Sequence, residues 1–85
     1  MEYVVISFRS RAHTVKFVDF LREHNIPSEI VNTPKEAGVG CGLSVKVSKI
    51  FLPAVKKALV VLKLGSYAGI FLVVTVSGKR IVRSI

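Results

Sequence analysis

The sequence predicts an α+β fold in which two helices cover one face of a small antiparallel sheet. Three observations favour it: strand and helix patterns follow the order β-α-β-β-α-β, the 85-residue chain suits one domain, and 51% of its residues are hydrophobic. In so short a chain, that order is typical of a ferredoxin-like two-layer sandwich. We therefore expect a single domain over residues 1–85, with a core over about 3–76 and a C-terminal β-hairpin arm over 77–85.

The first strand and the first helix are expected within the opening 24 residues. Residues 3–8, YVVISF, are rich in β-branched and aromatic side chains, which predicts a central strand. Ser10 offers an N-cap for a helix over residues 11–24, in which apolar residues recur at helical spacing. Asn25 suits a left-handed position after the helix, and Pro27 prevents the helix from continuing.

Two short strands are expected on either side of a glycine-rich loop over residues 33–42. Residues 29–32 form one of them, and residues 43–47, LSVKV, alternate apolar and polar side chains as a half-buried strand does. In the predicted topology the strand after the loop runs antiparallel to the first strand. The loop then lies at the same sheet edge as the start of the first helix and the turn into the fourth strand.

The second helix and the last strands complete the pattern. Ser48 can cap a helix that closes at Gly65 and turns an apolar face towards the core. Residues 70–76 are the most strand-like segment of the chain, and Ser77-Gly78 makes a tight turn into residues 79–85. Four lysines are expected to point away from the apolar face of this helix: Lys49, Lys56, Lys57 and Lys63.

The glycine-rich loop holds the only cysteine of the chain, Cys41, between Gly40 and Gly42. Glycine permits positive φ and leaves amide groups unobstructed, so Gly40 and Gly42 can offer N–H donors to a thiolate or an oxyanion. The predicted topology adds the positive end of the first helix, with Ser10 and His13. Such neighbours lower the pKa of a thiol below its ordinary value of about 8.5. The alternative is that Cys41 is a small buried hydrophobic residue, a common role of free cysteine.

Two further side chains are candidates for supporting a thiolate at this edge. His13 can carry a proton, with a plain surface role as its alternative, and Lys35 in the loop adds positive charge. No Cys/His cluster has metal-ligand spacing, and no catalytic triad can be assembled, because no acid follows Glu36. The sequence therefore predicts no metal site, no cofactor and no hydrolase.

The positive charge is concentrated in the second part of the chain. Residues 1–36 carry five basic and five acidic side chains, whereas residues 37–85 carry eight basic ones and no acid, which accounts for the net charge of +8. This asymmetry favours an acidic partner protein, nucleic acid or anionic headgroups, with a solvated basic surface as the alternative. Few aromatic residues accompany the lysines, so a base-stacking nucleic-acid site is less favoured than a protein partner.

The chain shows no targeting pattern and no membrane-spanning pattern. No basic segment precedes an apolar stretch at its start, and the longest uncharged run, residues 64–78, is shorter than the roughly 20 apolar residues that span a bilayer. A single cysteine excludes an intramolecular disulfide. We expect a soluble cytoplasmic protein, with strand edges that are compatible with a homodimer.

Three segments carry a resemblance to a known family: the opening YVVISFRSRAHTVKF, the helix exit LREHNIPSEIVNTPKE, and CGLSVKV. Over roughly residues 3–76 the chain resembles the selenium/sulfur carrier-like family of small bacterial and archaeal domains. The Thr33-Pro34 turn, Cys41-Gly42 and Leu43 are the most specific matches. The second helix is more hydrophobic and basic than is usual in that family, and a basic arm follows the fourth strand. The resemblance implies a carrier role.

Three functions remain open on the sequence. The first is a sulfur or selenium relay protein without turnover of its own, in which Cys41 holds a persulfide or selenopersulfide between donor and acceptor proteins with acidic surfaces. The second is a nucleic-acid-binding module on the same fold. The third is an interaction domain in which Cys41 is structural. Exposure of the Cys41 thiol separates the first function from the third.

Overall fold

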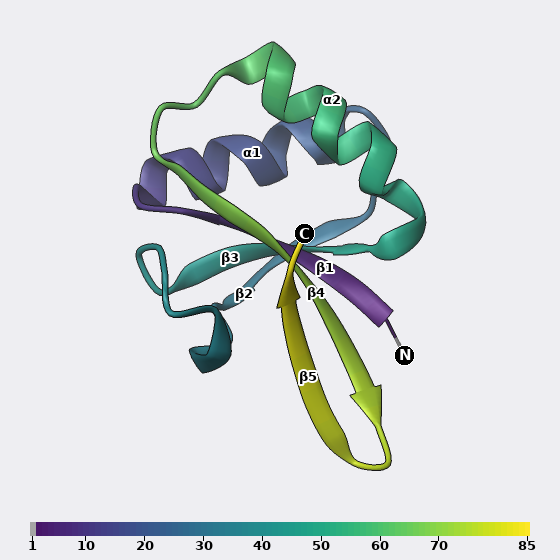
Figure 1. The fold of residues 1–85 in the computed structure, drawn as a ribbon. Coiled ribbons are helices and arrows are strands. Elements are labelled where there is room, and N and C mark those ends of the chain that lie inside the picture. The colour runs from purple at the N-terminus through teal and green to yellow at the C-terminus, as the bar shows by residue number, and fades with distance from the viewer. Residues whose placement is uncertain (1) are drawn as a thin grey trace.

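The computed structural model describes residues 2–85 and has an α+β fold, in which two helices lie on one face of a five-stranded sheet (Figure 1). The strands follow the order β2-β3-β1-β4-β5, and every neighbouring pair is antiparallel. The elements are β1 (Glu2–Phe8), α1 (Arg11–Glu23), β2 (Ser28–Asn32), the 3₁₀ turn η1 (Lys35–Ala37), β3 (Leu43–Ser48), the 3₁₀ turn η2 (Lys49–Phe51), α2 (Leu52–Leu62), β4 (Tyr67–Val76) and β5 (Lys79–Ser84). Among residues 2–85, neither helix has the length and apolar character needed to cross a bilayer.

The main core lies between the helices and the sheet. Alternate residues of β1 point into it, because side chains of a strand alternate between the two faces. Phe8 packs on Phe17 of α1, with 5.2 Å between the ring centroids. The buried members of this core are Val4, Ile6, Phe8, Phe17, Val18, Leu21, Val45, Val47, Val55, Ala58 and Ile70.

A second, smaller core lies on the opposite face of the sheet. Val5, Phe71 and Val73 are its buried members, and Ala37 of η1 packs against them. The η1 turn therefore lies on part of the face that the helices leave open, below the sheet in Figure 1. Residues 4–8 of β1 are buried on both faces, so the expectation of a central strand is confirmed.

The first helix begins and ends as the sequence predicts, but the second does not. The Ser10 hydroxyl accepts the His13 amide at 3.3 Å, and Asn25 has a positive φ of 60°. The prediction for Ser48 is wrong, because its side chain caps no helix and η2 separates it from α2. Gly65 does not close α2 either. Lys63 ends the helix with a φ of 48°, which turns the chain early enough for Leu64 to pack against the main core.

The fourth strand is longer than residues 70–76. It begins at Tyr67, because its first residues pair with the end of β1 across a register shift at Ser7/Phe8. Beyond it, Ser77 and Gly78 have positive φ angles of 50° and 76°, and β5 returns along β4. The turn end of this strand pair projects beyond the rest of the sheet (Figure 1).

Candidate functional site

Cys41 lies half-buried in the loop between η1 and β3, against the end of β1 and the first turn of α1. Its backbone N–H donates to the Phe8 carbonyl at 3.0 Å. Its sulfur lies 3.9 Å from the Thr14 hydroxyl, and its thiol donates to the Leu43 carbonyl at 3.8 Å. The structure therefore brings Cys41 to the sheet edge where the topology predicted it.

The turn before β4 meets the same edge through Ser66. The Arg9 amide donates to the Ser66 carbonyl at 2.8 Å, and the Ser10 amide donates to the Ser66 hydroxyl at 3.3 Å. The Ser66 hydroxyl also lies 2.6 Å from Nδ1 of His13. Figure 1 shows the start of α1, the loop before β3 and the turn before β4 at one end of the molecule. Within residues 2–85, the hydrogen bond of the His13 ring is thus to Ser66 and none joins it to Cys41.

Gly40 is needed where the loop passes the end of β1. Its φ is 89°, and a Cβ at this position would lie 3.1 Å from the Phe8 carbonyl oxygen. That oxygen is the acceptor of the Cys41 amide, so the close approach and the hydrogen bond belong to one contact. Gly42 has a similar φ of 92°, but a Cβ there would meet no atom within 4 Å.

Only some of the backbone polar groups around Cys41 take part in hydrogen bonds within residues 2–85. The N–H of Cys41 is already paired with Phe8, and the Gly42 carbonyl accepts the Thr33 amide at 2.9 Å. Among the described residues, the amides of Gly40 and Gly42 donate to no other backbone carbonyl. The donors that remain for a ligand are therefore those of the flanking glycines.

An ion pair ties the loop to the C-terminal strand. Arg80 of β5 makes two contacts with the Glu36 carboxylate, from Nε at 3.2 Å and from Nη2 at 2.9 Å. This hydrogen bonding lowers the pKa of Glu36 below its ordinary value of 4.5 and raises the pKa of Arg80. Because the neighbouring Ala37 packs on the second core, the segment ahead of Cys41 is held on the face opposite the helices.

A chain of hydroxyl groups ties the start of the loop to the sheet. The Ser7 and Ser44 hydroxyls lie 2.7 Å apart, and the Ser44 hydroxyl lies 2.7 Å from that of Thr33. Ser7 and Ser44 are completely buried, so each depends on these partners for its hydrogen bonds.

Several of these residues were missed by the sequence reasoning. Thr14 had a usable signal, because it shares the helical spacing of the buried Phe17, Val18 and Leu21. Ser66 and Arg80 had none, since each meets its partner across more than forty residues of sequence.

The lysines proposed for the site and for docking have different surroundings in the structure. Lys35 is exposed and lines an open hollow of about 230 Å³ on the glycine loop, and the structure shows no contact between it and Cys41. Lys49 is paired with Glu2 at 2.7 Å. Lys56, Lys57 and Lys63 are exposed and have no ion pair within residues 2–85.

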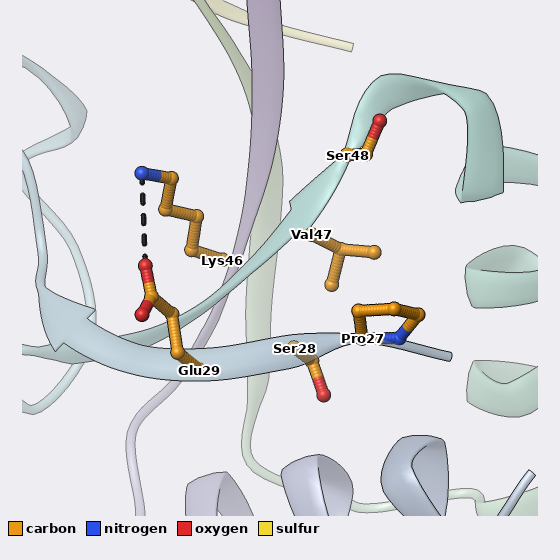
Figure 2. A pocket seen from close by; sticks show the side chains of 6 residues that line it. All are labelled: Pro27, Ser28, Glu29, Lys46, Val47 and Ser48. Atoms are coloured by element: carbon orange, nitrogen blue, oxygen red, sulfur yellow. Dashed lines mark ion pairs between the residues drawn. The ribbon is translucent and has the colours of Figure 1, made fainter. Parts of the chain in front are cut away.

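A separate hollow of about 310 Å³ lies where β2 begins and β3 ends, at the other end of β3 from Cys41 (Figure 2). Figure 2 shows Lys46 and Glu29 pointing towards one another on one side of it, 3.6 Å apart, while the Ser28 hydroxyl points away. The part of the chain that the structure describes contains no group of three or more side chains that would hold a metal ion.

One comparison with known proteins identifies the family. Residues 3–65 match the family model described as "Putative Se/S carrier protein-like", which is more than half of the chain and ends before β4. No curated protein and no solved structure matches the chain. The match agrees with the family that the three sequence segments suggested. The chain belongs to the Putative Se/S carrier protein-like family.

Proposed function

We propose that the protein holds a sulfur or selenium atom on Cys41, as a persulfide or selenopersulfide, and passes it to a partner protein. Membership of the carrier family supports this reading. The observation that carries it is the placement of a half-buried cysteine, free of any disulfide, beside the first turn of α1. The protein has no turnover of its own in this proposal, and its donor and acceptor are proteins with acidic surfaces. We place it in the cytoplasm.

The transfer is a displacement at sulfur that needs no oxidant. The Cys41 thiolate attacks the terminal sulfur of a donor persulfide. The donor's S–S bond breaks, a new S–S bond forms on Cys41, and the donor leaves as a thiolate. An acceptor nucleophile then attacks the same terminal atom, and Cys41 leaves as the thiolate it began as. Selenium in place of the terminal sulfur follows the same steps.

Groups around Cys41 can stabilise both anions of the transfer, the thiolate and the persulfide. The positive end of α1 attracts an anion, and the Thr14 hydroxyl, which donates to the Ser10 carbonyl at 3.2 Å, can turn its proton towards the sulfur 3.9 Å away. The amides of Gly40 and Gly42 can donate to the anionic terminal atom of a persulfide. His13, oriented by Ser66, is our candidate for carrying the thiol proton to solvent, and Lys35 adds positive charge on the loop.

The fold assignment goes with this proposal. We infer that the first four strands and two helices form a ferredoxin-like unit and that β4 and β5 form the expected hairpin arm. The strand order and the helices on one face support the first inference, and the tight turn at Ser77-Gly78 supports the second.

The test is the reactivity of Cys41 in the folded protein. Iodoacetamide at neutral pH is expected to alkylate the native protein faster than it alkylates an unstructured cysteine peptide. Incubation with a cysteine desulfurase and cysteine is expected to add the mass of one sulfur atom, and Cys41→Ser to abolish that adduct. Thr14→Val, which keeps the volume and removes the hydroxyl, is expected to slow alkylation without removing it.

Labelling that appears only in denaturant would refute the proposal, because the thiol would then be structural. A large loss of stability in Cys41→Ser would also indicate a structural thiol, since serine has nearly the volume of cysteine but its hydroxyl is destabilising in an apolar site.

A further inference from the structure

The second helix exposes apolar side chains that the core does not use. Ile50, Val60 and Val61 are 77%, 69% and 66% exposed and are the most exposed large hydrophobic residues of the described chain. All three lie on η2 or α2. A surface helix normally places polar residues on its outer face, so this clustering marks an interaction surface better than scattered exposure would.

An apolar groove, lined in part by the exposed Val61, lies between α1 and α2. It has a volume of about 380 Å³. Phe20, His24 and Ile26 line one side, and a single stripe of α2 lines the other: Ala54, Lys57, Ala58 and Val61. The spacing of that stripe is the i, i+3, i+4, i+7 repeat of one helical face, so the groove runs along α2. We call it the interhelical groove.

The charge on the α2 side of the interhelical groove is positive and unneutralised. Lys56 and Lys57 precede Val60 by one helical turn, and Lys63 follows it, with no ion pair to any of the three within residues 2–85. The α1 side is mixed, because a smaller hollow beyond Phe20 is lined by Lys16, Asp19, Phe20, Glu23 and Leu62. An occupant therefore meets apolar side chains in the groove and positive charge along α2.

We propose that the interhelical groove binds a helical segment of a partner protein that has one apolar face and acidic residues beside it. Its apolar side chains enter the groove and cover Val60 and Val61, and its carboxylates pair with Lys56, Lys57 and Lys63. Because the groove is concave, it is better suited to the side chains of a helix than to the flat surface of a bilayer. A second copy of this chain would bring the same unneutralised lysines of its α2 to the contact, which disfavours self-association.

The C-terminal end of α2 links the interhelical groove to the region of Cys41. The C-terminal end of α2 leads into the turn of Ser66, which bonds to Ser10 and His13 at the cysteine edge (Figure 1). The interhelical groove itself lies towards the other end of α1, where Phe20, His24 and Ile26 line it, so a partner that also reaches Cys41 must extend along α2 to the Ser66 turn. The identity of this partner as a donor or acceptor rests on the proposed carrier function, whereas the binding of a helical segment in the groove does not.

The test uses two synthetic amphipathic peptides and the full ¹⁵N-labelled chain. Both peptides have leucine at positions i, i+3, i+4 and i+7, and the polar positions carry glutamate in one and lysine in the other. Titration of the glutamate peptide is expected to shift the amide resonances of α2 and of residues 20–26. The lysine peptide is expected to leave these resonances unchanged.

Variants define the surface. The double change Val60→Ser and Val61→Ser is expected to weaken glutamate-peptide binding by roughly tenfold or more, because burial of a valine contributes at least ~1.5 kcal/mol. Val76→Ser, at a residue 51% exposed on β4, is the matched control and leaves binding unchanged. Lys56→Gln with Lys57→Gln weakens binding and reduces its salt dependence, whereas Lys79→Gln does not.

Four outcomes would overturn the docking surface: equal binding of both peptides, shifts confined to β5, sedimentation with anionic phosphatidylglycerol vesicles in place of peptide binding, or a concentration-dependent dimer through α2. Alkylation of Cys41 in the unmodified protein, measured without peptide, tests the carrier function separately. If the glutamate peptide does not bind but Cys41 is alkylated rapidly, the docking surface is refuted and the carrier function is not.

Discussion

Alanine substitutions at Gly40 and Gly42 distinguish two reasons for glycine beside Cys41: the positive φ and the close packing of the loop against Phe8. Both residues have nearly the same positive φ, 89° and 92°. Only at Gly40 would the added Cβ meet other atoms, of which the Phe8 carbonyl oxygen at 3.1 Å and the Ser7 Cβ at 3.4 Å are the nearest. The two positions therefore differ in their packing against the end of β1.

The expected losses of stability have two sources, the positive φ and the contact with Phe8. A positive φ costs a non-glycine residue about 1–2 kcal/mol, and both variants carry this cost. In Gly40→Ala the loop must also move a few tenths of an ångström from a buried carbonyl that accepts the Cys41 amide. Weakening that hydrogen bond adds about 0.5–1.5 kcal/mol. We expect a loss of about 1–2 kcal/mol for Gly42→Ala and about 2–3 kcal/mol for Gly40→Ala.

Urea denaturation followed by circular dichroism measures the difference. Each kcal/mol also lowers the melting temperature by roughly 4–8 °C in a domain of this size. Gly65→Ala is the control, because this residue lacks a positive φ and a Cβ there has open space. Equal losses for Gly40→Ala and Gly42→Ala would refute the claim that the loop is packed against Phe8. Two neutral variants would refute the described loop backbone altogether.

Four further variants test the supports of the site and the end of α2. Because the pKa of Glu36 is lowered in the folded state, its ion pair with Arg80 stabilises the fold at pH values above 4.5 and is lost as the pH falls below that value. Arg80→Ala should therefore lower stability slightly at neutral pH and flatten the acid limb of a pH titration followed by thermal melting; an unchanged acid limb would contradict the pairing. Ser44→Ala should lower the free energy of unfolding measured in urea by about 1–3 kcal/mol, because it leaves the buried Ser7 hydroxyl without its hydrogen-bond partner. Ser7→Ala should lower it less, since the Ser44 hydroxyl still has Thr33 as a partner. Lys63→Gly should raise stability by about 1 kcal/mol, because Lys63 has the left-handed conformation that glycine adopts freely; a loss would mean that the α2 ending is misplaced.

The sequence by itself determined the features that depend on near neighbours along the chain. The β-branched and aromatic residues of the segment 3–8 predicted a central strand, and residues 4–8 are buried on both faces of the sheet. Ser10 and Asn25 marked the ends of α1, because a cap depends on the few residues around it. The order of these elements also predicted that the Cys41 loop would meet the start of α1, since antiparallel strands return the chain to the same edge.

The tertiary structure alone decided what surrounds and supports Cys41. Thr14, Ser66 and Arg80 reach the loop or its neighbours only through the register of strands far apart in sequence, and no local pattern carries that information. The end of α2 at Lys63 was decided in the same way. Gly65 is the better residue for a left-handed turn, but Leu64 must reach the main core, and burial of its side chain offsets the cost of a lysine at positive φ.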